Sequence, residues 1–127
     1  MKLLLDTSII IDFLRQKDKE KTIYITLTKA GYSLFISIIT HAELYSGKSI
    51  WEDEEFNQAL ETIFSGLTIL SLDLELSKAA GKIRAYHKIE LNDAIIAATA
   101  IENGCELVTL NVKDFEKIPH LKLFSEK

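Results

Sequence analysis

Short apolar runs alternate along the chain with longer segments in which apolar residues recur at the spacing of a helix face. The runs are rich in Leu, Ile and Val and predict strands at residues 2–5, 32–36, 67–70, 106–109 and 121–124. The intervals predict helices that begin near Ser8, Lys19, Thr40, Asp53, Leu74 and Asp93. Such alternation is typical of βαβ units, so we expect an α/β fold: a three-layer sandwich around a mostly parallel sheet of about five strands.

Two of the expected helices have patterns that place them in this sandwich. In residues 53–65, acidic and amide side chains lie opposite an apolar stripe, and Gly66 is expected to end the helix as a C′ glycine. The stripe consists of Phe56, Leu60, Ile63 and Phe64. The helix near Asp93 is rich in Ala, which predicts a central helix packed close against the sheet.

The first two helices are apolar over more than one face. Their apolar residues are Ile9, Ile10, Ile11, Phe13 and Leu14 in the first, and Ile23, Tyr24, Ile25 and Leu27 in the second. At about 100° per residue the first set covers about 200° of arc, more than one core-facing stripe needs. We therefore expect part of this surface to meet a second partner.

Length and composition indicate one ordered domain spanning residues 1–127. The chain is 127 residues long, with 47% hydrophobic and 27% charged residues, one Pro and five Gly, which excludes a disordered or collagen-like chain. Its single cysteine, Cys105, cannot form an intramolecular disulfide. The apolar run after Lys2 stops at Asp6, which predicts neither a signal peptide nor a membrane span, so we expect a cytoplasmic protein.

The net charge of −4 argues against a surface that binds nucleic acid through phosphate neutralisation alone. If the ligand is a polynucleotide, a metal ion must supply much of the attraction.

Four carboxylates stand where a predicted element begins or ends: Asp6, Glu43, Asp93 and Asp114. Each is embedded in apolar sequence, and no Lys or Arg lies within three residues of the first three. Moving a carboxylate into a partly desolvated position costs several kcal/mol, as a rough order of magnitude, unless another group compensates it. A divalent cation is the obvious compensator, and oxygen ligands favour Mg²⁺ or Mn²⁺.

Each acid alone also has a plainer interpretation. Asp93 suits the first turn of a helix capped by Asn92, and Glu43 suits a solvated helix position. Asp6 could be a turn residue before a helix cap, and Asp114 could form an Asx-type turn with Asn111. The carboxyl ends of parallel strands are where open α/β sheets bind ligands, so the four acids together favour a metal site for phosphodiester hydrolysis.

The segments that carry these acids resemble those of PIN-domain ribonucleases, most closely the VapC-like toxins of toxin–antitoxin pairs, and the match runs nearly end to end. The matching segments are residues 5–12, 39–47, 92–100 and 108–115. Taken together, these motifs are specific, although each alone is weak.

The resemblance implies an Mg²⁺- or Mn²⁺-dependent endoribonuclease that acts on RNA. Asp6, Glu43, Asp93 and Asp114 match the family's catalytic and metal-binding positions, and Thr7, Ser8, Thr109 and Asn111 match its supporting polar positions. It also implies a cognate antitoxin whose segment occupies the active-site groove, and a homodimer.

The chain departs from the family pattern at two places. Leu110 stands where the family usually has a basic residue, and the stretch between Arg84 and Asn92 is short and lacks the usual Gly-containing turn, so the placement of Asp93 depends on a shorter connection. Few cations are then left to touch RNA: Lys48, Lys82, Arg84, Lys88 and Lys113.

Other chemistry-bearing residues have weaker claims. His41 points about 200° away from Glu43 on a helix, which favours a packing or surface role. Asp12 either orients a group near the site or lies on a helix surface, and Cys105 is best explained as a small core residue. Trp51 with Tyr45 could line a partner groove or lie at the edge of the core.

Competing function classes fit less well. A phosphate-accepting receiver domain needs an acidic pair after its first strand, and a haloacid-dehalogenase-type phosphatase needs an Asp where Ser8 stands. Nucleases that act on DNA flaps usually carry helical insertions for which this chain has no room. A catalytically silent PIN-like interaction module is the remaining alternative, although all four acids are present.

Overall fold

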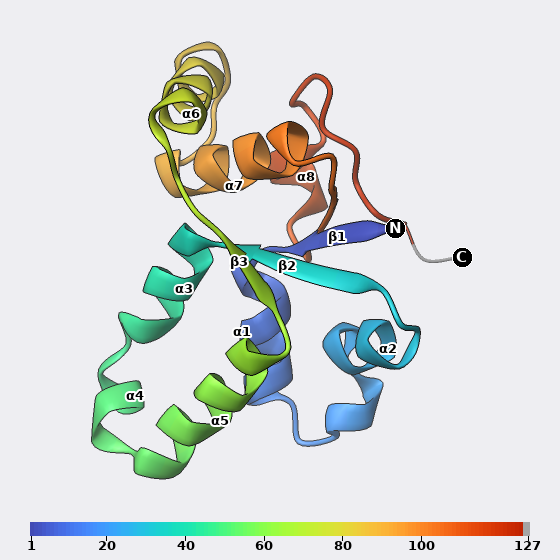
Figure 1. Cartoon of the computed structure of the whole chain (residues 1–127), viewed down its shortest axis with the longest axis vertical. Coiled ribbons are helices and arrows are strands. Elements are labelled where there is room, and N and C mark those ends of the chain that lie inside the picture. The colour runs from blue at the N-terminus through green and yellow to red at the C-terminus, as the bar shows by residue number, and fades with distance from the viewer. Residues whose placement is uncertain (126–127) are drawn as a thin grey trace.

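The computed structural model describes residues 1–125 and has a parallel sheet with helices on both faces (Figure 1). Its strands are β1 (Lys2–Leu5), β2 (Ser33–Ser37), β3 (Thr68–Leu70) and β4 (Glu106–Val108). Its α-helices are α1 (Thr7–Arg15), α2 (Ile23–Lys29), α3 (Ile38–Tyr45), α4 (Lys48–Glu52), α5 (Glu54–Ser65), α6 (Leu74–Tyr86), α7 (Leu91–Glu102) and α8 (Val112–Phe115). Among residues 1–125, no helix is long and apolar enough to cross a membrane.

The strand order is β3-β2-β1-β4, and every pair is parallel. β1 is central, and its residues Leu3, Leu4 and Leu5 are fully buried. Because successive side chains point to opposite faces of a strand, Leu4 packs in one core cluster and Leu3 and Leu5 pack in the other. The apolar run at the start of the sequence is therefore explained by burial on both faces.

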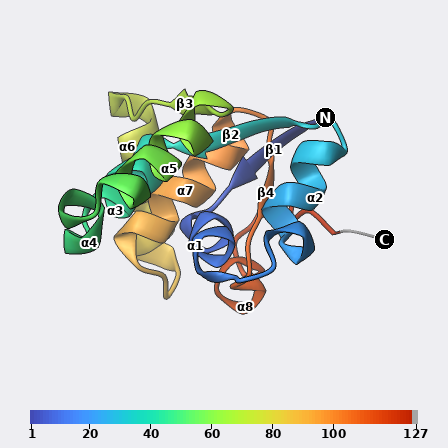
Figure 2. The same cartoon turned by 90° about the horizontal axis from the view of Figure 1, so that it is seen from below.

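The two core clusters join the sheet to two helical layers, which lie on opposite sides of it (Figure 1). Figure 2 shows the molecule from below, with the layer that contains α1 nearer the viewer. One layer contains α6, α7 and α8, and the other contains α1, α2 and α5. Helix α7 is buried along most of its length, and its alanines are almost inaccessible: Ala94, Ala97, Ala98 and Ala100. The three-layer α/β sandwich and the close-packed central helix are thus confirmed.

Helix α5 has the predicted one-sided pattern. Leu60 and Ile63 are buried, and the side chain of Asp53 caps the helix by accepting hydrogen bonds from the backbone N–H groups of Glu55 and Phe56. Gly66 follows the last residue of the helix, with a φ of −96°, so the prediction that it ends the helix is confirmed.

Three other details differ from the sequence prediction. The expected strand 121–124 is reduced to a single parallel bridge between Leu107 and Leu123, because β4 has only three residues and offers little edge for pairing. The helix expected near Lys19 is split into a 3₁₀ turn and α2, because Thr22 caps α2 with its side chain. The short helices α4 and α8 were not predicted.

The apolar faces of α1 and α2 largely pack together. Ile9, Ile10 and Leu27 are buried, and Phe13 lies against Tyr24 with ring centroids 4.8 Å apart. Ile11, Leu14, Ile23 and Ile25 are partly buried against the same core. Contact between the two helices therefore accounts for much of their excess apolar surface, and a further partner there stays a prediction.

The position of α8 depends on Phe115. A helix of four residues is not stable alone, and Phe115 is fully buried in the cluster formed with α7. Replacing it by Ala should lower the free energy of unfolding by about 3–5 kcal/mol, the cost of a large cavity. Val112→Ala, on an exposed part of α8, should change it by less than about 0.5 kcal/mol. Urea unfolding of both variants tests this anchor, and equal stabilities would contradict it.

Candidate functional site

Asp6 is a buried carboxylate at the carboxyl end of β1, and only 2% of it is exposed. Its Oδ1 accepts hydrogen bonds from the backbone N–H of Ser8, at 2.9 Å, and from the Ser8 hydroxyl. Its Oδ2 accepts a hydrogen bond from the Thr109 hydroxyl at 2.5 Å. Asp6 is also the N-cap of α1. Its orientation is therefore fixed from both sides.

Strand pairing explains why Asp6 and Thr109 meet. Leu5 of β1 is paired with Val108 of β4, and the backbone N–H of Asp6 donates to the Val108 carbonyl at 3.0 Å. The next residues of the two strands therefore leave the sheet side by side.

The loop after β4 is tied to α1 and to itself. The Leu110 N–H donates to the Ser8 hydroxyl oxygen at 3.1 Å, and the Asn111 N–H donates to the Thr109 hydroxyl oxygen at 2.9 Å. Of the predicted supporting residues, Ser8 and Thr109 contact Asp6 directly, whereas Asn111 acts here through its backbone.

Glu43 lies on α3 and is held by residues of two other helices. The Thr7 hydroxyl donates to Oε1 at 2.6 Å, and the Asn92 side-chain amide donates to Oε2 at 3.3 Å. Thr7, one of the predicted supporting residues, therefore contacts Glu43 directly. The expectation that Asn92 caps α7 is wrong, because Glu90 occupies the N-cap position and Asn92 lies inside the first turn.

Asp93 and Asp114 have more freedom. Asp93 is in the first turn of α7 and Asp114 is in the first turn of α8, and within residues 1–125 neither side chain makes a hydrogen bond. Both line a pocket of about 430 Å³ between α6, α7 and α8. A second pocket, of about 360 Å³, shares Asp93 and continues to Glu43. Glu43, Asp93 and Asp114 thus lie along one continuous depression, whereas Asp6 lines neither pocket.

The acids are close enough to perturb one another. The pKa of Asp93 is raised to about 6, first by burial and then by the negative charges of Asp6, Glu43, Asp114 and Glu90. Burial also raises the pKa of Asp6, against the opposing effect of its hydrogen bonds from Ser8 and Thr109. Negative charge is therefore concentrated here at a cost that a bound cation would relieve.

The donor set is suited to a hard divalent cation. Within residues 1–125, none of the four acids forms an ion pair with Lys, Arg or His. In that range, no group of three or more His, Cys, Asp or Glu side chains is arranged so that it could already hold a metal ion. Mg²⁺ is usually bound through one or two carboxylates and several waters, so an open arrangement of carboxylate oxygens fits it.

Sequence reasoning missed three residues of this site. Thr40 is fully buried, and its hydroxyl oxygen lies 3.2 Å from that of Thr7. It precedes Glu43 by three residues, a spacing that places both on one helix face and could have revealed it. Asn92 as a partner of Glu43 and Glu90 as a neighbour of Asp93 carried no sequence signal.

The residues with weaker claims lie outside the acid cluster. His41 packs against Phe64, with ring centroids 4.6 Å apart, which confirms its packing role. Asp12 accepts a hydrogen bond from Gln16 on the surface of α1, and Cys105 is buried. Trp51 is 69% exposed, which excludes the edge-of-core alternative for its side chain and leaves the partner-groove alternative open.

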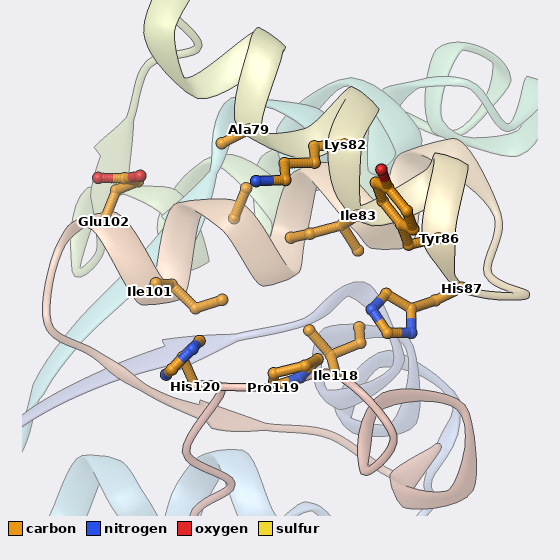
Figure 3. A pocket seen from close by; sticks show the side chains of 11 residues that line it. Ala79, Lys82, Ile83, Tyr86, His87, Ile101, Glu102, Ile118, Pro119 and His120 are labelled. Carbon is orange, nitrogen blue, oxygen red and sulfur yellow. The ribbon is translucent and has the colours of Figure 1, made fainter.

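A further hollow lies away from the four acids. It has a volume of about 660 Å³ and lies between α6, α7 and residues 118–120, where its walls are mainly apolar (Figure 3). Lys82 lies along it, and none of the four acids lines it.

Comparison with known proteins gives a consistent match. The model of the PIN domain family matches residues 3–121. Ribonuclease VapC2 of Haemophilus influenzae is 34% identical over 128 residues, and the alignment covers 96% of each chain. A toxin–antitoxin complex from Klebsiella pneumoniae contains a chain that is 30% identical, with a TM-score of 0.77 and coverage of 98% of this chain and 99% of that one.

A DNA-bound VapBC structure from Salmonella typhimurium has a TM-score of 0.83 at 27% identity, with coverage of 98% and 97%. Each comparison thus covers nearly the whole length of this chain and of the protein that it matches. The chain belongs to the PIN domain family.

Proposed function

We propose that this chain is a metal-dependent endoribonuclease that hydrolyses RNA phosphodiester bonds and acts as the toxin of a toxin–antitoxin pair. One observation carries the proposal: four carboxylates from β1, α3, α7 and α8 converge in a chain similar along its length to proteins named ribonuclease VapC. In this proposal residues 1–127 act as one PIN-like domain in the cytoplasm.

Asp6, Glu43, Asp93 and Asp114 would hold Mg²⁺ or Mn²⁺ through their carboxylate oxygens. When bound, such an ion would activate water and neutralise the charge that develops on the phosphodiester. The chain's own contribution is rigidity: Ser8 and Thr109 fix the Asp6 carboxylate, while Thr7 and Asn92 fix that of Glu43.

Asp93 and Asp114 complete the set from the other side of the depression. Because their side chains have no hydrogen-bond partner within residues 1–125, they can turn toward an ion or toward water without breaking a protein contact. In this proposal, Asp6 and Glu43 are held in fixed orientations, whereas Asp93 and Asp114 can change orientation when an ion or a substrate binds.

An antitoxin and a second copy of the chain are the proposed protein partners. The partly buried apolar residues of α1 and α2, with the exposed Trp51 and Tyr45 near it, support an additional protein surface. Structures similar to this chain include toxin–antitoxin complexes. Both partners stay predictions for this chain.

Sedimentation equilibrium tests the homodimer. The purified chain should have twice the monomer mass of 14.4 kDa at micromolar concentration. A mass that stays at the monomer value as the concentration is raised would contradict the dimer.

Cleavage of total cellular RNA with Mg²⁺ or Mn²⁺ tests the proposed activity. Asp6→Asn and Asp93→Asn should each lower kcat/KM by at least about 10²-fold, since each removes a carboxylate that is proposed to hold the metal ion. Glu102→Gln is the matched control, because it makes a similar change at an exposed position of the same helix as Asp93.

The control should cleave like the parent chain, and the loss of cleavage in Asp6→Asn excludes a contaminating nuclease. Full activity of Asp6→Asn would refute the site. An inactive parent chain that binds no metal would favour the catalytically silent interaction module instead.

The raised pKa of Asp93 predicts a pH-dependent stability of the metal-free protein. Its pKa is about 6 in the folded state and near 3.8 in an unfolded chain, so the folded state binds more protons between these values. The free energy of unfolding should therefore fall as the pH rises from about 4 to about 6, and the raised pKa of Asp6 acts in the same direction.

Thermal unfolding in EDTA at a series of pH values measures this effect. Asp93→Asn should show a smaller fall over that range and a higher melting temperature than the parent chain at pH 7, because it removes one repelling charge. If the melting temperatures of the two proteins changed with pH in parallel, the prediction that burial and neighbouring charges raise the pKa of Asp93 would be contradicted.

A further inference from the structure

Two positively charged side chains lie beside the acids without forming an ion pair with them. Arg84 and Lys88 line the pocket of about 430 Å³ that also contains Glu90, Asp93 and Asp114. Both side chains are exposed, and neither forms an ion pair with an acid within residues 1–125. Their charges are therefore available to a ligand.

The helix hairpin α6–α7 produces this arrangement. Arg84 lies in the last turn of α6, and Asp93 lies in the first turn of α7, and only residues 87–90 separate the two helices. Lys88 lies in this connection. Its backbone carbonyl accepts a hydrogen bond from the Lys117 ammonium group. The connection is thus tied to the segment after α8, which carries Asp114.

The charges of the residues that line the pocket indicate which ligand it can bind. Its three carboxylates and two cations leave one negative charge in excess. A divalent cation at the acids would change this to one positive charge, which matches a single phosphodiester group. Without Arg84 and Lys88 the same ion would leave the pocket negative and repel a phosphate.

We propose that Arg84 and Lys88 bind a backbone phosphate of single-stranded RNA next to the bond cleaved at the acids, and so set the path of the strand. The strand would run along the depression from Glu43 past Asp93 to Arg84, in line with the two pockets that share Glu90 and Asp93. This inference rests on the proposed ribonuclease function and deepens it.

Arginine suits this task because its planar guanidinium can donate two parallel hydrogen bonds to a phosphate. An RNA backbone contact is independent of base sequence, so it can be measured without knowing the natural target. The other cations on this part of the chain are less well placed. Lys82, two residues before Arg84, points to the opposite side of α6 and lines the apolar hollow instead (Figure 3).

Lys82 therefore provides a matched control, since Lys82→Gln removes the same charge from the same helix. The first experiment measures binding of a fluorescein-labelled, mixed-sequence single-stranded 12-mer RNA to Asp93→Asn in EDTA. In this background the pocket has no excess negative charge, cleavage is disabled, and no metal is needed.

Adding Arg84→Gln should weaken binding about tenfold, and adding Lys88→Gln should weaken it several-fold. Each should also lower the slope of log K against log salt concentration by about 0.7, as expected for one lost phosphate contact on a single strand. Adding Lys82→Gln should change the affinity less than twofold. Arg84→Lys, which keeps the charge, should recover part of the affinity.

The second experiment compares RNA cleavage by the otherwise unmodified chain and its Arg84→Gln variant. KM should rise about tenfold with little change in kcat, because the contact is made in the ground state as well. Melting temperatures of all variants check that each is folded, and Mn²⁺ affinity should not weaken on loss of Arg84.

Equal effects of the Arg84, Lys88 and Lys82 substitutions would overturn the inference, because only general charge would then matter. No RNA binding by the Asp93→Asn background, or a loss confined to kcat, would also overturn it. Failure of the parent chain to cleave any RNA, with the binding differences intact, would instead contradict the proposed function alone.

Discussion

The buried carboxylate of Asp6 is the constraint on which the rest of the site depends. A carboxylate with 2% exposure costs several kcal/mol, as an order of magnitude, unless its oxygens are satisfied. Hydroxyl groups from Ser8 on α1 and Thr109 after β4 satisfy both oxygens, and parallel pairing of β1 with β4 brings these donors together. The β1–β4 pairing, the start of α1 and the beginning of the loop after β4 therefore meet at one group.

The remaining acids are brought near Asp6 by helices that are held in place by the apolar core. The alanines of α7 allow close packing on the sheet, and this places Asp93 where burial, together with the negative charges of four nearby carboxylates, raises its pKa to about 6. The fold thus uses packing energy to oppose electrostatic repulsion. Such a site can attract a cation strongly. A chain with a net charge of −4 repels an RNA strand, however, and positively charged side chains at the pocket, such as that of Arg84, reduce this repulsion locally.

Much of this architecture is predictable from sequence because its causes are local. Buried strands give unbroken apolar runs, as at Leu3 to Leu5, and Asp6 directly after such a run marks the end of a strand. What could not be predicted depends on tertiary contacts. Helix α8 is stable only because Phe115 is buried. Asn92 donates to Glu43 because α3 packs near α7. Residues 121–124 form only a bridge because β4 is too short to pair with a full strand.

The central claim is that the converging carboxylates form a divalent cation site, and Mn²⁺ binding followed by electron paramagnetic resonance tests it most directly. Bound Mn²⁺ loses most of the signal of the free aqueous ion, so the titration reports affinity without RNA or a partner protein. We expect saturable binding by the parent chain and by Glu102→Gln, and binding at least about tenfold weaker by Asp6→Asn. Equal Mn²⁺ affinity in the parent chain and Asp6→Asn, or no binding by the parent chain, would contradict it.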